Sequence, residues 1–128
     1  MSAQIIDGKA LAATLRDTIA QEITALRKLD MRVPGLAVVL VGEDPASQVY
    51  VRNKEAACAA AGIFSEKITP DRDISQAALE ELIDSLNQRD DIDGILVQLP
   101  LPKHLDTDAL LDRIDPRKDV DGFCLLYT

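Results

Sequence analysis

Hydrophobic residues lie along the chain in two patterns, short continuous runs and stripes with helical spacing. The runs 36–41 (LAVVLV) and 95–99 (ILVQL) are almost wholly apolar, which is typical of strands covered on both faces in a parallel sheet. The run 63–69 (IFSEKIT) is more polar, so we predict a strand nearer the edge of that sheet.

Helical signals flank the first of these strands. Asp7 is a suitable N-cap for a helix whose apolar residues form a single stripe. These residues are Leu11, Leu15, Ile19, Ile23 and Leu26. Asp44 and Pro45 are typical of the N-cap and first turn of a second helix, which we expect to end at Gly62.

Two further helices are predicted in the second half of the chain. Ser75 is a suitable cap for one of them. Its inner side carries Leu79, Leu82, Ile83 and Leu86. Thr107 begins a shorter helix that ends before Pro116, because the residue preceding a proline disfavours helical geometry. The order αβαβαβα predicts the α/β class, with a single domain of three layers (αβα) around a parallel sheet.

Ligands of such sheets bind at the carboxyl ends of the strands, where we expect the segments 42–47, 70–75 and 100–106. The chain contains neither a GxGxxG nor a GxxxxGK(S/T) motif, and its six glycines are scattered. We therefore expect this chain alone to bind no dinucleotide cofactor.

Composition narrows the range of partners. The net charge is −8 at pH 7 and the basic residues form no cluster, which argues against nucleic acid. No apolar run approaches the roughly 20 residues of a membrane helix, and the first residues do not resemble a secretory signal. Cys58 and Cys124 match no metal-binding spacing and are typical of reduced thiols. We expect a cytoplasmic protein without a bound metal, with no membrane partner, and with the lone His104 in a surface loop.

Three side chains are suited to chemistry. Tyr50 and Lys54 are four residues apart, so one helix would place them on the same face. A ring beside an amine would stack a flat heterocycle and supply an acid or base, although a half-buried tyrosine and a solvated lysine explain the spacing as simply. Gln98 interrupts an apolar strand, and a buried amide needs hydrogen-bond partners, either structural or catalytic.

Three blocks, VGEDPASQVYVRNKEAACAAAGI, DGILVQLPLP and DPRKDVDGF, with IIDGKALA near the start, resemble the signature segments of the methylenetetrahydrofolate dehydrogenase/cyclohydrolase family. They occur in the family's order and cover about residues 4–123. The resemblance implies an enzyme that oxidises 5,10-methylenetetrahydrofolate to the 5,10-methenyl form with NADP and hydrolyses this to 10-formyltetrahydrofolate. It also implies a homodimer for the intact enzyme.

The resemblance further implies roles for single residues. Lys54 matches the catalytic lysine, Tyr50 the tyrosine packed against the folate rings, and Gln98 the glutamine that orients the lysine. Asp121 matches the aspartate that accepts hydrogen bonds from the pterin. The other substrate-binding positions implied by the same blocks are Val51, Arg52, Asn53, Val97, Leu99 and Pro100.

The implied chemistry is physically consistent. A lysine that acts as a base must be deprotonated near neutral pH, and burial against Tyr50 and a bound pterin would disfavour its ammonium form. The neutral amide of Gln98 would hold the amine without adding a charge that retains the proton.

The chain departs from the family after Phe123, where CLLYT replaces the His-Pro-type segment that leads into a second, Rossmann-like NADP domain. We therefore divide it into a folate-binding catalytic domain, 1–123, and a divergent tail, 124–128. We expect it to lack that second domain, to bind no NADP by itself, and to be inactive or impaired alone. An alternative from another functional class is a non-catalytic folate-binding or partner-binding remnant.

Overall fold

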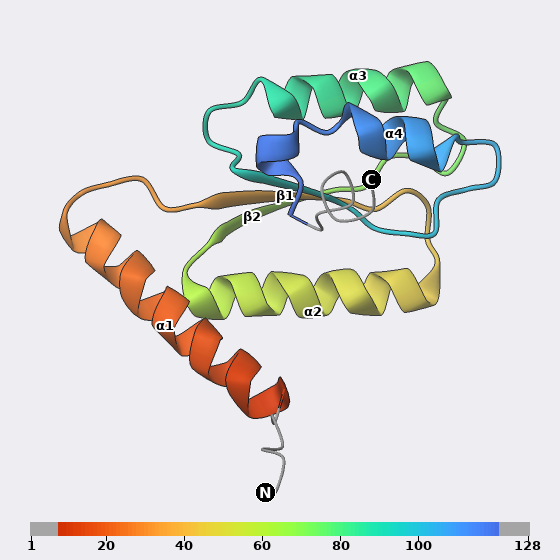
Figure 1. Ribbon diagram of the computed structural model, residues 1–128. Coiled ribbons are helices and arrows are strands. Elements are labelled where there is room, and N and C mark those ends of the chain that lie inside the picture. Colours follow the sequence, from red (N-terminus) through yellow and green to blue (C-terminus); the bar gives the residue numbers. More distant parts are fainter. Residues whose placement is uncertain (1–7, 121–128) are drawn as a thin grey trace, which may run out of the picture.

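The computed structural model describes residues 8–120, with side chains from residue 14 onward (Figure 1). Its elements follow in chain order as α1 (Gly8–Lys28), β1 (Gly35–Val39), α2 (Pro45–Ala61), β2 (Phe64–Ile68), α3 (Gln76–Asn87), β3 (Gly94–Val97), α4 (Thr107–Arg113) and the 3-10 helix η1 (Pro116–Lys118). The predicted α/β order is confirmed, and the three strands are shorter than the apolar runs that predicted them. Asp7 lies outside the described residues.

The three strands form one parallel sheet in the order β2-β1-β3. The more polar run supplies an edge strand, as predicted, while the run 36–41 supplies the central strand and the apolar run 95–99 the other edge. Helices α3 and α4 cover one face of the sheet and α2 covers the other (Figure 1). This arrangement is the expected three-layer αβα domain.

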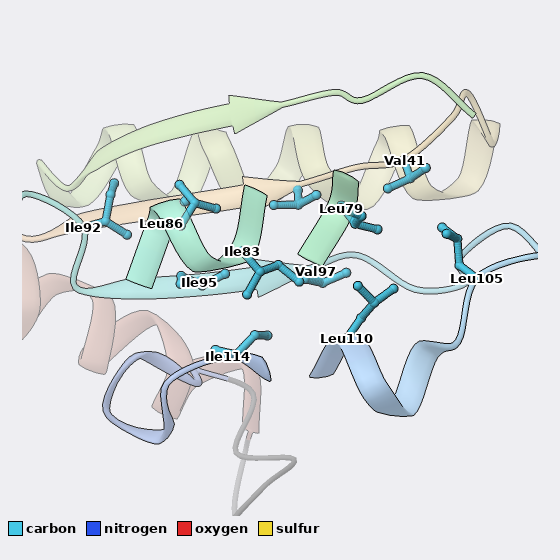
Figure 2. Packing of buried hydrophobic residues seen from close by; sticks show 12 residues of the cluster. Val41, Leu79, Ile83, Leu86, Ile92, Ile95, Val97, Leu105, Leu110 and Ile114 are labelled. Atoms are coloured by element: carbon cyan, nitrogen blue, oxygen red, sulfur yellow. The ribbon is translucent and has the colours of Figure 1, made fainter. Parts of the chain in front are cut away.

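Side chains of a strand point alternately to opposite faces, so the sheet has two separate cores. The larger core lies between the sheet and helices α3 and α4 (Figure 2). It contains Ala37, Val39, Val41, Leu79, Ile83, Leu86, Ile92, Ile95, Val97, Leu105, Leu110 and Ile114. The smaller core faces α2 and contains Val38, Leu40, Val51 and Leu96.

The two ends of α2 are formed by the residues that predicted them. The Asp44 carboxylate accepts hydrogen bonds from the backbone N–H and the hydroxyl of Ser47, both at 2.9 Å. Gly62 ends the helix with a φ of 83°, in the left-handed region. A Cβ at this position would also lie 3.0 Å from the Ile23 side chain, so glycine is required for both reasons.

Among the described side chains of the apolar stripe predicted for α1, burial is found toward the C-terminal end of the helix. Ile23 is buried, and Arg27 Nη2 donates to the carbonyl oxygen of Gly62 at 3.3 Å. Leu15 and Ile19 belong to the same stripe but are 54% and 40% exposed. The reason is that α1 crosses the outside of α2 near its C-terminal end and projects beyond it (Figure 1). No described helix is long and apolar enough to cross a membrane.

Replacing Leu79 with alanine should destabilise the domain by about 2–5 kcal/mol, because the side chain is completely buried against the sheet and its removal leaves a cavity. Leu29 is 70% exposed, so Leu29→Ala is the matched control and should change the free energy of unfolding by less than about 0.5 kcal/mol. Urea unfolding followed by circular dichroism measures both. Equal effects of the two substitutions would contradict the placement of α3 over the larger core.

An ion pair ties the beginning of β1 to the beginning of β3. Arg32 donates two hydrogen bonds to the Asp93 carboxylate, at 2.7 and 2.9 Å, and the backbone N–H of Gly35 donates a third at 2.8 Å. The hydrogen bonds from Arg32, with a smaller contribution from Gly35, lower the pKa of Asp93 to about 2.

This depressed pKa predicts a pH dependence of stability. A carboxyl whose folded pKa lies below its unfolded value of about 3.9 stabilises the fold above that value and loses the contribution as the pH falls toward 2. The effect is reduced by solvent screening, since the side chain is 45% exposed. We expect Asp93→Asn to be less stable than the exposed control Asp112→Asn near neutral pH. The difference between the free energies of unfolding of the two variants should narrow between about pH 4 and pH 2 in urea titrations. A difference that stays constant over this range would contradict the ion pair.

Candidate active site beside the last strand

Alternation along β3 places Gln98 on the face that α2 covers. Leu96 packs in the core beneath α2, Val97 packs in the opposite core, and Gln98 follows with the orientation of Leu96. The backbone N–H of Gln98 donates to the carbonyl oxygen of Val39 at 2.9 Å, so the chain continues beside β1 beyond the strand. The side chain is only 9% exposed. Gln98 is therefore the buried amide that the sequence predicted.

Lys54 lies on α2 beside the residues that face the sheet. Ser47, Val51 and Cys58 are the buried positions of this helix face, and Lys54 is half-buried next to them. Lys54 Nζ donates to Gln98 Oε1 at 2.8 Å. The structure thus joins two of the residues that the resemblance singled out, from segments 44 positions apart.

The amide of Gln98 has one orientation that satisfies both of its ends. Nε2 donates to the carbonyl oxygen of Leu99 at 3.0 Å, while Oε1 accepts from Lys54. Rotation of the amide by half a turn would set two donors against each other and two acceptors against each other. The backbone carbonyl therefore fixes which atom faces the lysine. The peptide bond that follows, Leu99–Pro100, is cis.

The other flank of α2 points toward the edge strand β2. Lys67 of β2 lies 3.9 Å from a carboxylate oxygen of Glu55, the residue next to Lys54. The sequence pattern did not indicate this ion pair, because Glu55 and Lys67 lie on different predicted elements. Residues 54 and 55 thus extend to opposite sides of the helix, which leaves the Lys54 side open toward β3.

Cys58 lies one turn after Lys54 but is not a candidate nucleophile. It is 8% exposed, and burial raises the pKa of its thiol, with the charge of Glu55 adding to the effect. A reactive cysteine needs the opposite shift. We regard Cys58 as a reduced structural thiol, while Cys124 lies outside the described residues.

Tyr50 occupies the turn of α2 before Lys54. Its side chain is 58% exposed, so the ring is accessible to a ligand. The four-residue spacing places the ring and the amine on neighbouring positions of one helix face, as predicted. An exposed ring next to a half-buried amine is a suitable surface for stacking a flat heterocycle.

The remaining positions of the implied site are placed differently. Val51 and Val97 are 1% and 2% exposed and pack in the two cores, so their side chains support the site from beneath rather than line it. The more accessible positions are Arg52, Asn53, Leu99 and Pro100. Asp121 lies outside the described residues.

A broad, open depression of about 1340 Å³ lies at the carboxyl ends of the strands. It is lined by parts of the three segments expected there, 41–44, 69–73 and 100–104. Neither Lys54 nor Gln98 lines it. Because the hydrogen-bonded amine and amide lie beside β3 rather than in this depression, we place the candidate site at Lys54 and Gln98. His104 is exposed, and its Nε2 forms a hydrogen bond of 2.8 Å with the carbonyl oxygen of Ile74. It lies in a surface loop, as predicted.

The N-terminus of α2 is poorly suited to a dinucleotide phosphate. The N-terminus of α2 opens at the carboxyl end of β1, where phosphate groups bind in related folds. Here the backbone N–H of Ser47 already donates a hydrogen bond to the Asp44 carboxylate. The hydrogen bonds from Ser47 lower the pKa of that carboxyl. A phosphate would meet this negative charge. No group of three potential metal ligands occurs within the described range.

Residues 6–121 match the model of a protein family described as tetrahydrofolate dehydrogenase/cyclohydrolase, catalytic domain. Bifunctional protein FolD 1 of Hydrogenovibrio crunogenus is 56% identical over 123 residues, which make up 96% of this chain and 43% of that protein. The structure of the bifunctional enzyme FolD from Campylobacter jejuni matches with a TM-score of 0.87 and 44% identity, covering 91% of this chain and 41% of that one. The structure of a Trypanosoma brucei methylenetetrahydrofolate dehydrogenase-cyclohydrolase, solved with NADP cofactor and an inhibitor, matches with a TM-score of 0.85 and 37% identity. The match covers 96% of this chain and 42% of that one. The chain spans less than half the length of the relatives it matches.

The contact between Lys54 and Gln98 predicts how the amine reacts when its partner changes. Gln98→Glu replaces a neutral acceptor at 2.8 Å with a carboxylate, which should hold the lysine as an ammonium ion. We expect acylation of Lys54 by acetic anhydride near neutral pH to slow by about tenfold, as measured by mass spectrometry of the labelled peptides. The exposed Lys28 is the internal control and should react equally in both proteins. Unchanged labelling of Lys54 would show that the contact is absent in solution.

Proposed function

Since the chain belongs to the tetrahydrofolate dehydrogenase/cyclohydrolase family, we propose that it binds a tetrahydrofolate derivative beside β3 and that Lys54 transfers protons there. The reactions concerned are those that interconvert 5,10-methylene-, 5,10-methenyl- and 10-formyltetrahydrofolate. The observation that carries the proposal is the hydrogen bond of 2.8 Å between Lys54 Nζ and Gln98 Oε1.

The neutral partner of Lys54 suits a proton-transfer role. A carboxylate at the same distance would stabilise the ammonium form and weaken the amine as a base. The Gln98 amide instead fixes the position of the nitrogen without charge, and its own orientation is fixed by the carbonyl oxygen of Leu99. The amine is therefore held in place and is still able to exchange a proton with a bound reactant.

The hydrolytic step has a defined proton balance. Water adds to the carbon that joins N5 and N10 of the 5,10-methenyl form, and Lys54 accepts a proton from the attacking water. The hydroxyl group formed in this way then loses its proton to solvent as its oxygen becomes the carbonyl oxygen. At the same time the bond between that carbon and N5 breaks, the electron pair goes to N5, and the carbon remains on N10 as a formyl group. Protonation of N5 by the lysine would complete the step, and one proton is released to solvent over the whole reaction.

Binding of the substrate would use the surface around this pair. The exposed ring of Tyr50 supports stacking of the flat part of the folate, close to Lys54 on the same helix. Asp121 would accept hydrogen bonds from the pterin, because a carboxylate matches two adjacent N–H groups. Leu99, which follows Gln98 in the chain, and Pro100, which also lines the neighbouring depression, would extend the same surface.

The oxidation of the methylene form with NADP belongs, in this proposal, to the longer enzymes of the family. The Asp44 carboxylate makes the N-terminus of α2 poorly suited to a phosphate, and we assign the cofactor to no residue of this chain. Assembly into a homodimer is likewise proposed for the longer enzyme.

Lys54→Met should abolish catalysis while leaving binding nearly intact. We expect the purified chain to bind tetrahydrofolate in a calorimetric titration and, because we expect it to be impaired alone, to accelerate the loss of 5,10-methenyltetrahydrofolate absorbance only weakly above the buffer rate. The substitution should lower the enzymatic rate by about 10²- to 10⁴-fold, the usual contribution of general acid–base catalysis, and change the dissociation constant by less than about threefold. Lys28→Met is the control and should leave both quantities unchanged.

The outcomes separate the proposal from its alternative. A chain that binds tetrahydrofolate without accelerating hydrolysis would be a non-catalytic folate-binding protein. Normal hydrolysis by Lys54→Met would remove the proposed role of the lysine. Absence of tetrahydrofolate binding by the unaltered chain would contradict the proposal as a whole.

A further inference from the structure

The short segment from Gln98 to Leu101 is fixed at both ends. At its start, the backbone N–H of Gln98 donates to the carbonyl oxygen of Val39 at 2.9 Å, which ties the chain to the central strand. At its end, the partly buried side chain of Leu101 packs against the larger core, on the opposite side of the sheet from α2. Only Leu99 and Pro100 lie between these two points, and a proline ring fixes one of the backbone angles. The backbone of this segment therefore has little freedom to move.

The loop that follows Leu101 is held against the beginning of α3. His104 Nε2 forms a hydrogen bond of 2.8 Å with the carbonyl oxygen of Ile74, and the Ile74 side chain packs against the same larger core. The backbone N–H of Leu105 donates to the carbonyl oxygen of Pro102 at 3.1 Å, and the Leu105 side chain is buried in that core. Leu101 is thus the first of several anchors that hold this loop in place.

The carbonyl oxygen of Leu99 is the group of this segment that contacts the candidate site. It accepts a hydrogen bond from Gln98 Nε2 at 3.0 Å, while Gln98 Oε1 accepts from Lys54 Nζ at 2.8 Å. If this carbonyl moved away, the amide would be free to turn, and the amine would lose its fixed acceptor for part of the time. The contact between Gln98 and Lys54 thus depends on where the backbone holds Leu99.

We propose that Leu101 is a positioning residue, whose packing in the larger core holds the Leu99 carbonyl oxygen where it orients the amide of Gln98 toward Lys54. The importance of this orientation for catalysis rests on the proposed function, in which Lys54 transfers protons. Leu101 acts through Leu99 and Gln98. An apolar contact on one face of the sheet thereby fixes a polar group on the other face.

The first test measures by NMR how fast the side-chain amide protons of Gln98 exchange with water in the full chain. Leu101→Ala should speed this exchange by at least about threefold, because the hydrogen bond from Nε2 to the Leu99 carbonyl is then held less well. Leu101→Met nearly conserves the volume of the side chain and should restore the exchange rate to within about twofold. An exchange rate in Leu101→Ala equal to that of the unaltered chain would overturn the proposal.

Leu82→Ala is the matched control for a general loss of stability. Leu82 is also a partly buried leucine packed against the larger core, but it lies on α3. Its replacement should destabilise the fold and leave the exchange at Gln98 unchanged. Equal acceleration by Leu82→Ala and Leu101→Ala would contradict the proposal. If Leu101→Ala does not fold, as judged by circular dichroism, Leu101→Val takes its place with the same direction of change.

The second test follows acylation of Lys54 by acetic anhydride, with Lys28 as the internal control. Leu101→Ala should speed acylation of Lys54 about threefold, because Gln98 Oε1 then holds the amine for less of the time. If Leu101 acts through the amide, the same substitution should have no further effect when Gln98→Ala is already present. An equal acceleration in both backgrounds would contradict the proposal.

Neither test uses a folate, so the two proposals can fail separately. If the unaltered chain binds no tetrahydrofolate in the calorimetric titration, the proposed function fails, and the exchange at Gln98 still decides whether Leu101 positions the amide. If tetrahydrofolate binds and the exchange at Gln98 is the same in Leu101→Ala as in the unaltered chain, the proposed function stands and the role of Leu101 is refuted.

Discussion

The alternation of side chains along β3 is the constraint on which the candidate site depends. Because consecutive residues of a strand face opposite ways, Leu96 and Gln98 share the face that α2 covers, and Val97 belongs to the other core. A shift by one residue would turn the amide toward α3 and bury it among aliphatic side chains without Lys54. The register of β3 is held by its pairing with β1, in which Val39 lies opposite Val97. The central apolar strand therefore decides where the polar chemistry is found.

The position of α2 supplies the other half of the site, and packing contributes more to it than charge. Val51 lies on the side of α2 that faces the sheet and is 1% exposed. Burial of such a side chain stabilises the fold by about 1.5–3 kcal/mol. The ion pair between Glu55 and Lys67 is long and partly exposed, so it contributes about 0–1 kcal/mol. The apolar contact between α2 and the sheet thus sets the height and rotation of the helix. Lys54, three residues after Val51, is then positioned by the same contact.

The parts of the fold that depend on local pattern could be predicted from the sequence. Asp44, Gly62 and Ser75 fix helix ends through hydrogen bonds or backbone geometry within a few residues, and each lies where its pattern indicated. The edge position of β2 was indicated by its polar residues, whereas β3 is just as apolar as a central strand and is nevertheless the other edge strand of the sheet. Leu15 and Ile19 show where this reasoning stops, because the pattern identifies an apolar stripe but not how far a neighbouring helix covers it.

The contacts of the site depend on long-range geometry, which explains what could not be predicted from spacing alone. Lys54 and Gln98 were suggested by a resemblance to a family, whereas their contact required the structure because 44 residues separate them. Lys118 was not singled out, since a lysine between an arginine and an aspartate looks like any solvated residue. Its hydrogen bonds to backbone carbonyls become visible only when the end of α3, some 30 residues away in sequence, is brought beside it.

The two lysines show how the number of acceptors separates anchoring from chemistry. Lys118 is surrounded by three backbone carbonyls, so every N–H of its ammonium group has a partner in the fold. Lys54 is given one side-chain acceptor by the described residues, at 2.8 Å, and it sits beside an exposed aromatic ring. An amine whose donors are all used by the backbone is a structural cap, because breaking those bonds would leave carbonyls without partners. An amine held at one point keeps its position and still presents the rest of its surface to a reactant, which is what a proton-transfer group requires.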